Sequence, residues 1–179
     1  MMRLLFVGVL GLALSACAAI PDSAEEAAMR ERPQQPQMHA SLVRGMLQKG
    51  QNHAALAHIE ELERVGQSNP DELRWLRALA LYKLDQLADS KLEYQALLKT
   101  EYAAQAYHGL GLIAARHDLR QAVIYFNQAV KLRPTDAEIR NDLGYTLLLA
   151  GRMLEARHHL ATAAELAPDS TKAQSNLVL

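Results

Sequence analysis

Small and apolar residues recur from about residue 36 onward at the three- and four-residue spacings of helices. Ala and Leu are abundant, whereas the β-branched residues that favour strands are sparse. The pattern predicts helices at 37–49, 53–65, 70–84, 87–99, 103–116, 119–131, 137–150 and 153–165, with a terminal piece at 169–178. With 50% hydrophobic and 22% charged residues, the 179-residue chain suits one compact all-α domain.

The same positions repeat with a period near 34 residues. Small residues in the second helix of each pair are separated by 35, 32 and 34 positions, at Ala55, Ser90, Ala122 and Ala156. The best copy, which reproduces the spacing of a tetratricopeptide (TPR) repeat, has Leu143-Gly144, Gly151, Ala156, Leu160, Ala163 and Pro168. This resemblance implies an all-α, right-handed superhelical TPR solenoid of about four helix pairs with a short C-terminal capping helix. The copies span about 36–70, 71–103, 104–136 and 137–170, and the cap spans 171–179.

Helices that cross closely need small residues where they touch. We expect the close contacts at Gly111, Gly144, Ala122 and Ala156, with the larger Phe126 and Leu160 filling the remaining space. Candidate helix N-caps are Asn52, Asn69, Asp118 and Asp136. The turn of the third copy, around 116–118, is one residue shorter than the repeat requires.

The first residues indicate export. Arg3 precedes an uncharged apolar run of 13 residues, 4–16, which suits a signal peptide and is too short to span a membrane. Leu14-Ser15-Ala16-Cys17 resembles the lipobox of bacterial lipoproteins, so we expect a signal peptide at 1–16, lipidation of Cys17 and a flexible tether at 17–35. In such lipoproteins Ala18 is compatible with transport to the outer membrane. Ala16-Cys17-Ala18 also fits an ordinary cleavage site, which would release a soluble periplasmic protein.

Other chemistries find little support in the sequence. A formal net charge of -1 does not indicate binding to nucleic acid. A single cysteine excludes an internal disulfide or a cysteine-based zinc site, and neither His158-His159 nor the step from His53 to His58 places two ligands on one helix face. We therefore expect no enzyme activity, cofactor, metal or small-molecule substrate, and contact with the membrane through the lipid alone.

The inner face of the solenoid is the candidate binding surface. In TPR arrays the first helix of each pair lines a concave groove. Counting from the register, its inward positions are Arg44, Trp75, Leu79, Tyr82, Lys83, His108, Leu112, Arg116, Asn141, Tyr145 and Leu148. Aromatic and basic groups of this kind often concentrate protein-binding energy. The alternative is that Trp75, Leu79 and Leu148 belong to the core between the repeats.

Behind the expected lipoprotein leader, the C-terminal part of the chain has three characteristic segments: Asn141-Asp142-Leu143-Gly144-Tyr145, Leu148–Arg152 and Asn176-Leu177. This combination resembles the TadD-type lipoproteins of tight-adherence (Tad, or Flp) pilus assembly. The resemblance implies a pilotin-like role, in which an outer-membrane lipoprotein helps a secretin subunit reach or assemble in that membrane. The alternative is an adaptor that recruits cell-wall enzymes or outer-membrane assembly factors.

Overall fold

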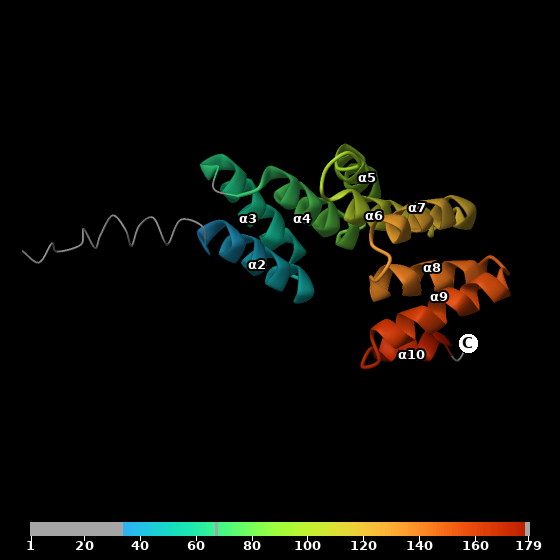
Figure 1. The fold of residues 1–179 in the computed structure, drawn as a ribbon. Helices are drawn as coiled ribbons and strands as arrows, with labels where there is room; N and C mark the ends of the chain where they lie inside the picture. The colour runs from blue at the N-terminus through green and yellow to red at the C-terminus, as the bar shows by residue number, and fades with distance from the viewer. Residues whose placement is uncertain (1–33, 67, 178–179) are drawn as a thin grey trace, which may run out of the picture.

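The computed structural model describes residues 34–66 and 68–177, which form a chain of stacked helices (Figure 1). Cys17, the predicted signal peptide and all but the last two residues of the predicted tether lie outside the described residues. Nine α-helices and no strand occur in the described ranges: α2 (Gln34–Gln48), α3 (Asn52–Val65), α4 (Pro70–Lys83), α5 (Leu87–Ala96), α6 (Ala103–Ala114), α7 (Leu119–Leu132), α8 (Ala137–Leu149), α9 (Met153–Leu166) and α10 (Thr171–Leu177).

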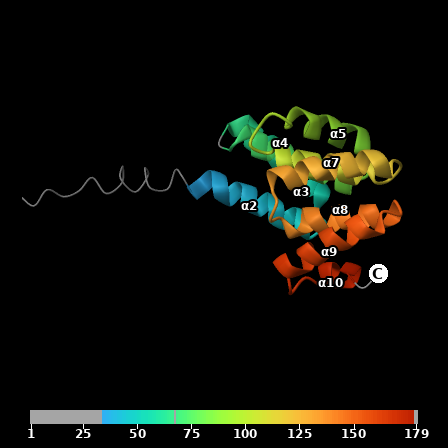
Figure 2. The same ribbon diagram turned by 45° about the vertical axis from the view of Figure 1, so that its right-hand side comes forward.

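The helices stack in the order of the sequence, because each one packs against the next. The first helices of successive pairs also touch: α2 contacts α4, α4 contacts α6, and α8 contacts α10. A second view shows α7, α8, α9 and α10 as successive layers (Figure 2). This arrangement confirms the predicted all-α solenoid with a short terminal helix.

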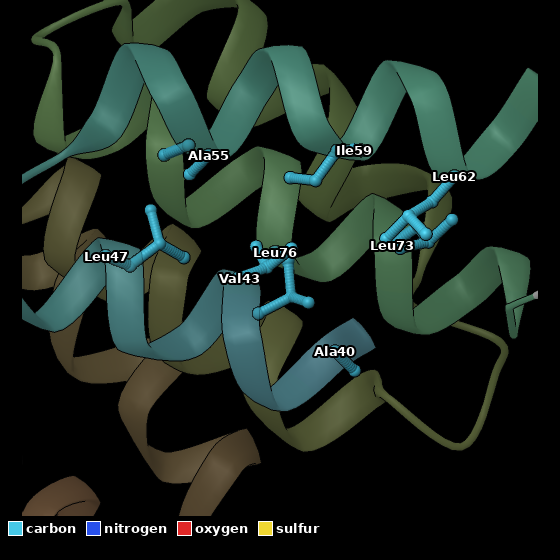
Figure 3. Packing of buried hydrophobic residues seen from close by; sticks show 9 residues of the cluster. Ala40, Val43, Leu47, Ala55, Ile59, Leu62, Leu73 and Leu76 are labelled. Carbon is cyan, nitrogen blue, oxygen red and sulfur yellow. The ribbon is translucent and has the colours of Figure 1, made fainter. Parts of the chain in front are cut away.

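The core is a series of apolar clusters, each shared by neighbouring helices. Figure 3 shows the first cluster, to which α2 contributes Val43 and Leu47, α3 contributes Ile59, and α4 contributes Leu73 and Leu76. Every one of these side chains is at most 2% exposed. Stability in such a stack comes from the contacts between adjacent helices.

Three of the four predicted N-caps are confirmed. The side chains of Asn69, Asp118 and Asp136 accept hydrogen bonds from backbone N–H groups in the first turns of α4, α7 and α8. The prediction for Asn52 is wrong, because this residue already lies in α3 and Gln51, which makes no side-chain cap, precedes it. Helix α10 begins at Thr171, two residues later than predicted, and Ser170 Oγ accepts a hydrogen bond from the N–H of Ala173.

The turn between the two helices of each pair shows why the turn of the third copy is one residue shorter than the others. In the other three pairs the turn contains a residue with positive φ, namely Gly50 at 73°, Asp85 at 63° and Gly151 at 76°. In each, the N–H of the following residue donates to a carbonyl five positions back. Between α6 and α7 the N–H of Asp118 instead donates to the carbonyl of Ala114, four positions back. The shorter turn therefore needs no left-handed residue.

The expected close approaches of paired helices are confirmed at two glycines. A Cβ atom at Gly111 would lie 2.6 Å from the ring of Phe126, and one at Gly144 would lie 2.7 Å from Leu160 Cγ. In the second copy Ser90 takes the small position, and its Oγ donates a hydrogen bond of 2.8 Å to the carbonyl of Ala78. A buried hydroxyl is thus accommodated because it has a partner.

Candidate functional site

A pocket of about 200 Å³ opens between α4, α6 and the start of α8. Helices α4 and α6 are first helices of their pairs, so the pocket lies on the face that the sequence assigned to the groove. Four predicted groove residues line it together: Trp75, Leu79, His108 and Leu112. Tyr94, Gln105, Gly109, Arg133, Asp136, Glu138 and Ile139 complete the wall. We call this cavity the inner pocket.

Trp75, which lines the inner pocket, is held in place by contacts with Tyr102 and Arg44. Its ring lies 5.9 Å from that of Tyr102 in a stacked arrangement, and the Arg44 guanidinium lies 5.9 Å from the centre of the Trp75 ring. Arg44 is in turn fixed by an ion pair of 2.9 Å with Glu72. A large aromatic side chain held in one orientation forms a contact surface that loses little entropy on binding.

The wall from α6 contains an unsatisfied polar atom. The Oε1 atom of Gln105 is buried and has no hydrogen-bond partner among the described residues. Leaving a buried acceptor unpaired costs about 1–3 kcal/mol. A bound group that donates an N–H would recover part of that cost if the Gln105 side chain turned this oxygen toward the pocket.

The opposite rim of the inner pocket carries charge. Asp136 Oδ1 accepts hydrogen bonds from the backbone N–H groups of Glu138 and Ile139 and so caps α8. Asp136 Oδ2 lies 3.8 Å from Arg133 Nη1. Glu138 is exposed. The rim therefore offers two carboxylates and one guanidinium beside a lining that is largely apolar but also includes Gln105 and His108.

A second polar cluster joins α6, α8 and α10. Asp142, which is 9% exposed, accepts hydrogen bonds from His108 Nε2 at 2.9 Å and from Lys172 Nζ at 2.7 Å. Asn141, which is 2% exposed, donates to Asp142, and its own oxygen accepts a bond of 2.9 Å from Asn176 Nδ2. Burial alone would raise the pKa of Asp142, but the hydrogen bonds from His108 and Lys172 outweigh it and hold that pKa below its ordinary value. The cluster attaches α10 to α8.

The remaining predicted groove residues lie outside the inner pocket. Tyr82 packs against the cluster around Tyr94, Lys83 is exposed, and Arg116 is exposed and paired with Asp85. Tyr145 is 40% exposed, and Leu148 lines a different pocket at the last helix pair. Asn141 is buried and hydrogen-bonded to Asn176, so the structure does not place it on an open inner face.

Sequence reasoning missed the polar wall of the pocket. Gln105 precedes His108 by three positions on α6, so helical spacing could have found it. Arg133 and Asp136 lie in the turn before α8. The groove positions were counted only within the first helices, so these two residues were not among them. Within the described ranges no group of three or more metal-binding side chains occurs. No helix there is long and apolar enough to cross a membrane.

Stacked helix pairs with an inner pocket define a class of helical-repeat protein that works through its surface. A family model described as Tetratricopeptide repeat matches residues 114–178. The TPR repeat-containing protein PA4299 of Pseudomonas aeruginosa is 36% identical over an alignment of 181 residues, gaps included. The alignment covers 99% of this chain and 71% of the relative. The chain belongs to the tetratricopeptide-repeat family. Proteins of this family are typically non-enzymatic scaffolds that bind other proteins.

Solved structures share the fold at low sequence identity. YrrB, described as a TPR protein with an unusual peptide-binding site, is 18% identical with a TM-score of 0.58, over 88% of this chain and 89% of YrrB. A MamA double mutant (RS-1) is 18% identical with a TM-score of 0.59, over 79% of this chain and 80% of MamA. These two likenesses support the helical-repeat architecture.

Proposed function

We propose that this chain is a lipid-anchored, periplasm-facing scaffold that binds a segment of another protein in the inner pocket and catalyses no reaction. The observation that carries the proposal is the combination of a fixed apolar surface at Trp75 with the unpaired oxygen of Gln105. A peptide segment has a group for each of them: an apolar side chain that packs on Trp75 and a backbone N–H that donates to the Gln105 oxygen. Binding sites commonly combine an apolar lining with a few polar groups that fix orientation.

The partner that we propose is a secretin subunit of a Tad/Flp-type pilus, which the scaffold helps to localise or assemble in the outer membrane. The support is the lipobox-like Leu14–Cys17 segment together with the resemblance of the last repeat to TadD-type lipoproteins. A lipid anchor at Cys17 would keep the scaffold at the membrane, and a tether would let the inner pocket reach a periplasmic partner.

Gln105→Leu tests the pocket without removing an interaction on which the fold depends. The variant removes the unpaired acceptor and its cost, so we expect it to keep or raise the melting temperature and to weaken binding of the secretin segment by about 1–3 kcal/mol. Trp75→Ala should weaken binding by about 2 kcal/mol or more. Lys91→Ala and Gln128→Ala, on the second helices α5 and α7, are the controls and should change the affinity little. Isothermal titration with the purified segment measures all four.

The cellular test measures secretin multimers in envelopes. A strain without this protein, or with Gln105→Leu, should contain less assembled multimer, while the variant remains in its membrane. Normal multimer levels in the deletion strain would rule out the pilotin-like role. The adaptor function would then be tested by cross-linking at Glu138 on the pocket rim in intact envelopes, with capture of a cell-wall enzyme expected.

A further inference from the structure

The starts of the first helices α4, α6 and α8 lie together beside the inner pocket. The side chain of Asn69, which precedes α4, donates a hydrogen bond of 3.0 Å to Glu101, which precedes α6. Glu138 at the start of α8 lines the inner pocket together with Gln105 near the start of α6. One side of the pocket therefore brings together residues from three helix starts.

Ion pairs balance only part of the charge on this side. Arg44 pairs with Glu72 at 2.9 Å, and Arg133 lies 3.8 Å from Asp136. Among the described residues, three further carboxylates at these helix starts have no ion-pair partner: Asp71, Glu101 and Glu138. We call these three residues the acidic edge.

The acidic edge reaches the aromatic surface of the pocket. Burial raises the pKa of the Tyr102 hydroxyl most, and the carboxylates of Glu72 and Glu101 raise it further. Asp71 adds to this effect. Tyr102 stacks on Trp75, which lines the inner pocket. Negative charge therefore lies both at the pocket rim and beside the aromatic pair.

The helix dipoles do not cancel this charge. Acidic residues are common in the first turns of helices, because the N-terminal end of a helix is positive. Each such end contributes about half a positive charge at most, so three ends together supply less than the three carboxylates remove. The acidic edge is therefore net negative, and an apolar pocket adjoins it.

We propose that the segment bound in the inner pocket is basic, with an apolar side chain in the pocket and flanking lysine or arginine residues along the acidic edge. This inference rests on the function proposed above and specifies its partner. Lysine and arginine fit because their aliphatic stems can cover apolar surface while their charged ends reach carboxylates. An acidic segment would find Arg44 and Arg133 already engaged by Glu72 and Asp136.

The test compares three labelled peptides of equal length on the full chain. Each has a central leucine, which is flanked by lysines, by glutamines or by glutamates. Fluorescence anisotropy should show that the lysine peptide binds up to about fivefold more tightly than the glutamine peptide and that the glutamate peptide binds most weakly. In about 1 M salt, where the Debye length is about 3 Å, the three affinities should converge.

Glu138→Gln should reduce the preference for lysine and leave the affinity for the glutamine peptide unchanged, and Glu138→Lys should reverse the preference. Asp89→Asn is the matched control. Asp89 is also exposed and in the first turn of a helix, α5, but it does not line the inner pocket. A preference that Asp89→Asn reduces as much as Glu138→Gln does would overturn the proposal, because the net charge of the chain would then cause it.

Two further outcomes separate this inference from the proposed function. Equal binding of the three peptides at low salt, weakened in every case by Trp75→Ala, would overturn the basic partner and leave the inner pocket as a binding site. Failure of all three peptides to bind would overturn both proposals.

Discussion

At the scale of the residue, close packing of the paired helices depends on the missing side chain of Gly144. An added Cβ would meet the side chain of Leu160 at 2.7 Å and its backbone nitrogen at 3.1 Å, and the backbone cannot easily move. Gly144→Leu should therefore destabilise the fold by about 1–3 kcal/mol, measured by urea unfolding. Gly45→Ala in α2 is the control. Nothing lies within 4 Å of its added Cβ, so it should stabilise the helix by up to about 1 kcal/mol.

A second prediction at this scale concerns Asp85, a non-glycine residue with positive φ at 63°. The left-handed conformation costs an L-residue about 1–2 kcal/mol, and glycine avoids that cost. Asp85→Gly should stabilise the fold by about 0.5–1 kcal/mol, because the exposed ion pair to Arg116 that it removes contributes little. Thermal unfolding measures the change. Asp85→Asn separates the two effects, since it removes the charge and keeps a side chain that tolerates positive φ. A loss of stability in both variants would show that the ion pair matters more than the strain.

Sequence reasoning at the residue scale succeeded within a repeat and failed between repeats. The contacts of Gly111 with Phe126 and of Gly144 with Leu160 follow from the spacing inside one copy. The sequence did not reveal that Gly109 lies against Tyr94, where an added Cβ would come within 2.2 Å of the ring. That contact joins two copies, and its geometry depends on how the copies stack.

At the scale of the element, the position of α10 depends on the charged cluster around Asp142. The pKa of Asp142 is lower in the folded protein than in the unfolded chain, so the ionised carboxylate stabilises the fold. This stabilisation is fully present above about pH 4 and is lost as the pH falls through the pKa that Asp142 has in the folded protein. Asp142→Asn should cost about 1–3 kcal/mol at pH 7, and the difference from the wild type should shrink below pH 4. Urea unfolding at a series of pH values measures it. A difference that stays constant down to pH 3 would contradict the role of the carboxylate.

Element boundaries were predictable where the signal is local. The caps at Asn69, Asp118 and Asp136 follow from one side chain reaching its own first turn. Helix α5 ends at Ala96, three residues before the predicted end, and the N–H of Leu97 donates to the Tyr94 carbonyl in a tighter turn. Leu97 is fully buried. Tertiary packing of this kind leaves no local mark in the sequence.

At the scale of the whole molecule, a repeat period sufficed to predict the solenoid, but not the full lining of the inner pocket. Helical spacing tells which residues share a face, and Trp75, Leu79, His108 and Leu112 do meet in the inner pocket. The curvature of the stack and the position of α10 decide which other residues remain open. Asn141 is covered for that reason, because Asn176 of α10 lies against it.

The attachment of the whole molecule to a membrane is the last prediction. The Leu14–Cys17 segment resembles a lipobox, and two or more acyl chains anchor a protein stably. Attachment to a membrane should therefore depend on lipid at Cys17. Cys17→Ser should abolish incorporation of radioactive palmitate and shift the protein to a soluble or uncleaved form in fractionated cells. Ser15→Ala, two positions away, should remain labelled and membrane-bound. Labelling that persists in Cys17→Ser would refute the lipoprotein assignment, and a wild-type protein that is soluble and unlabelled would favour ordinary secretion.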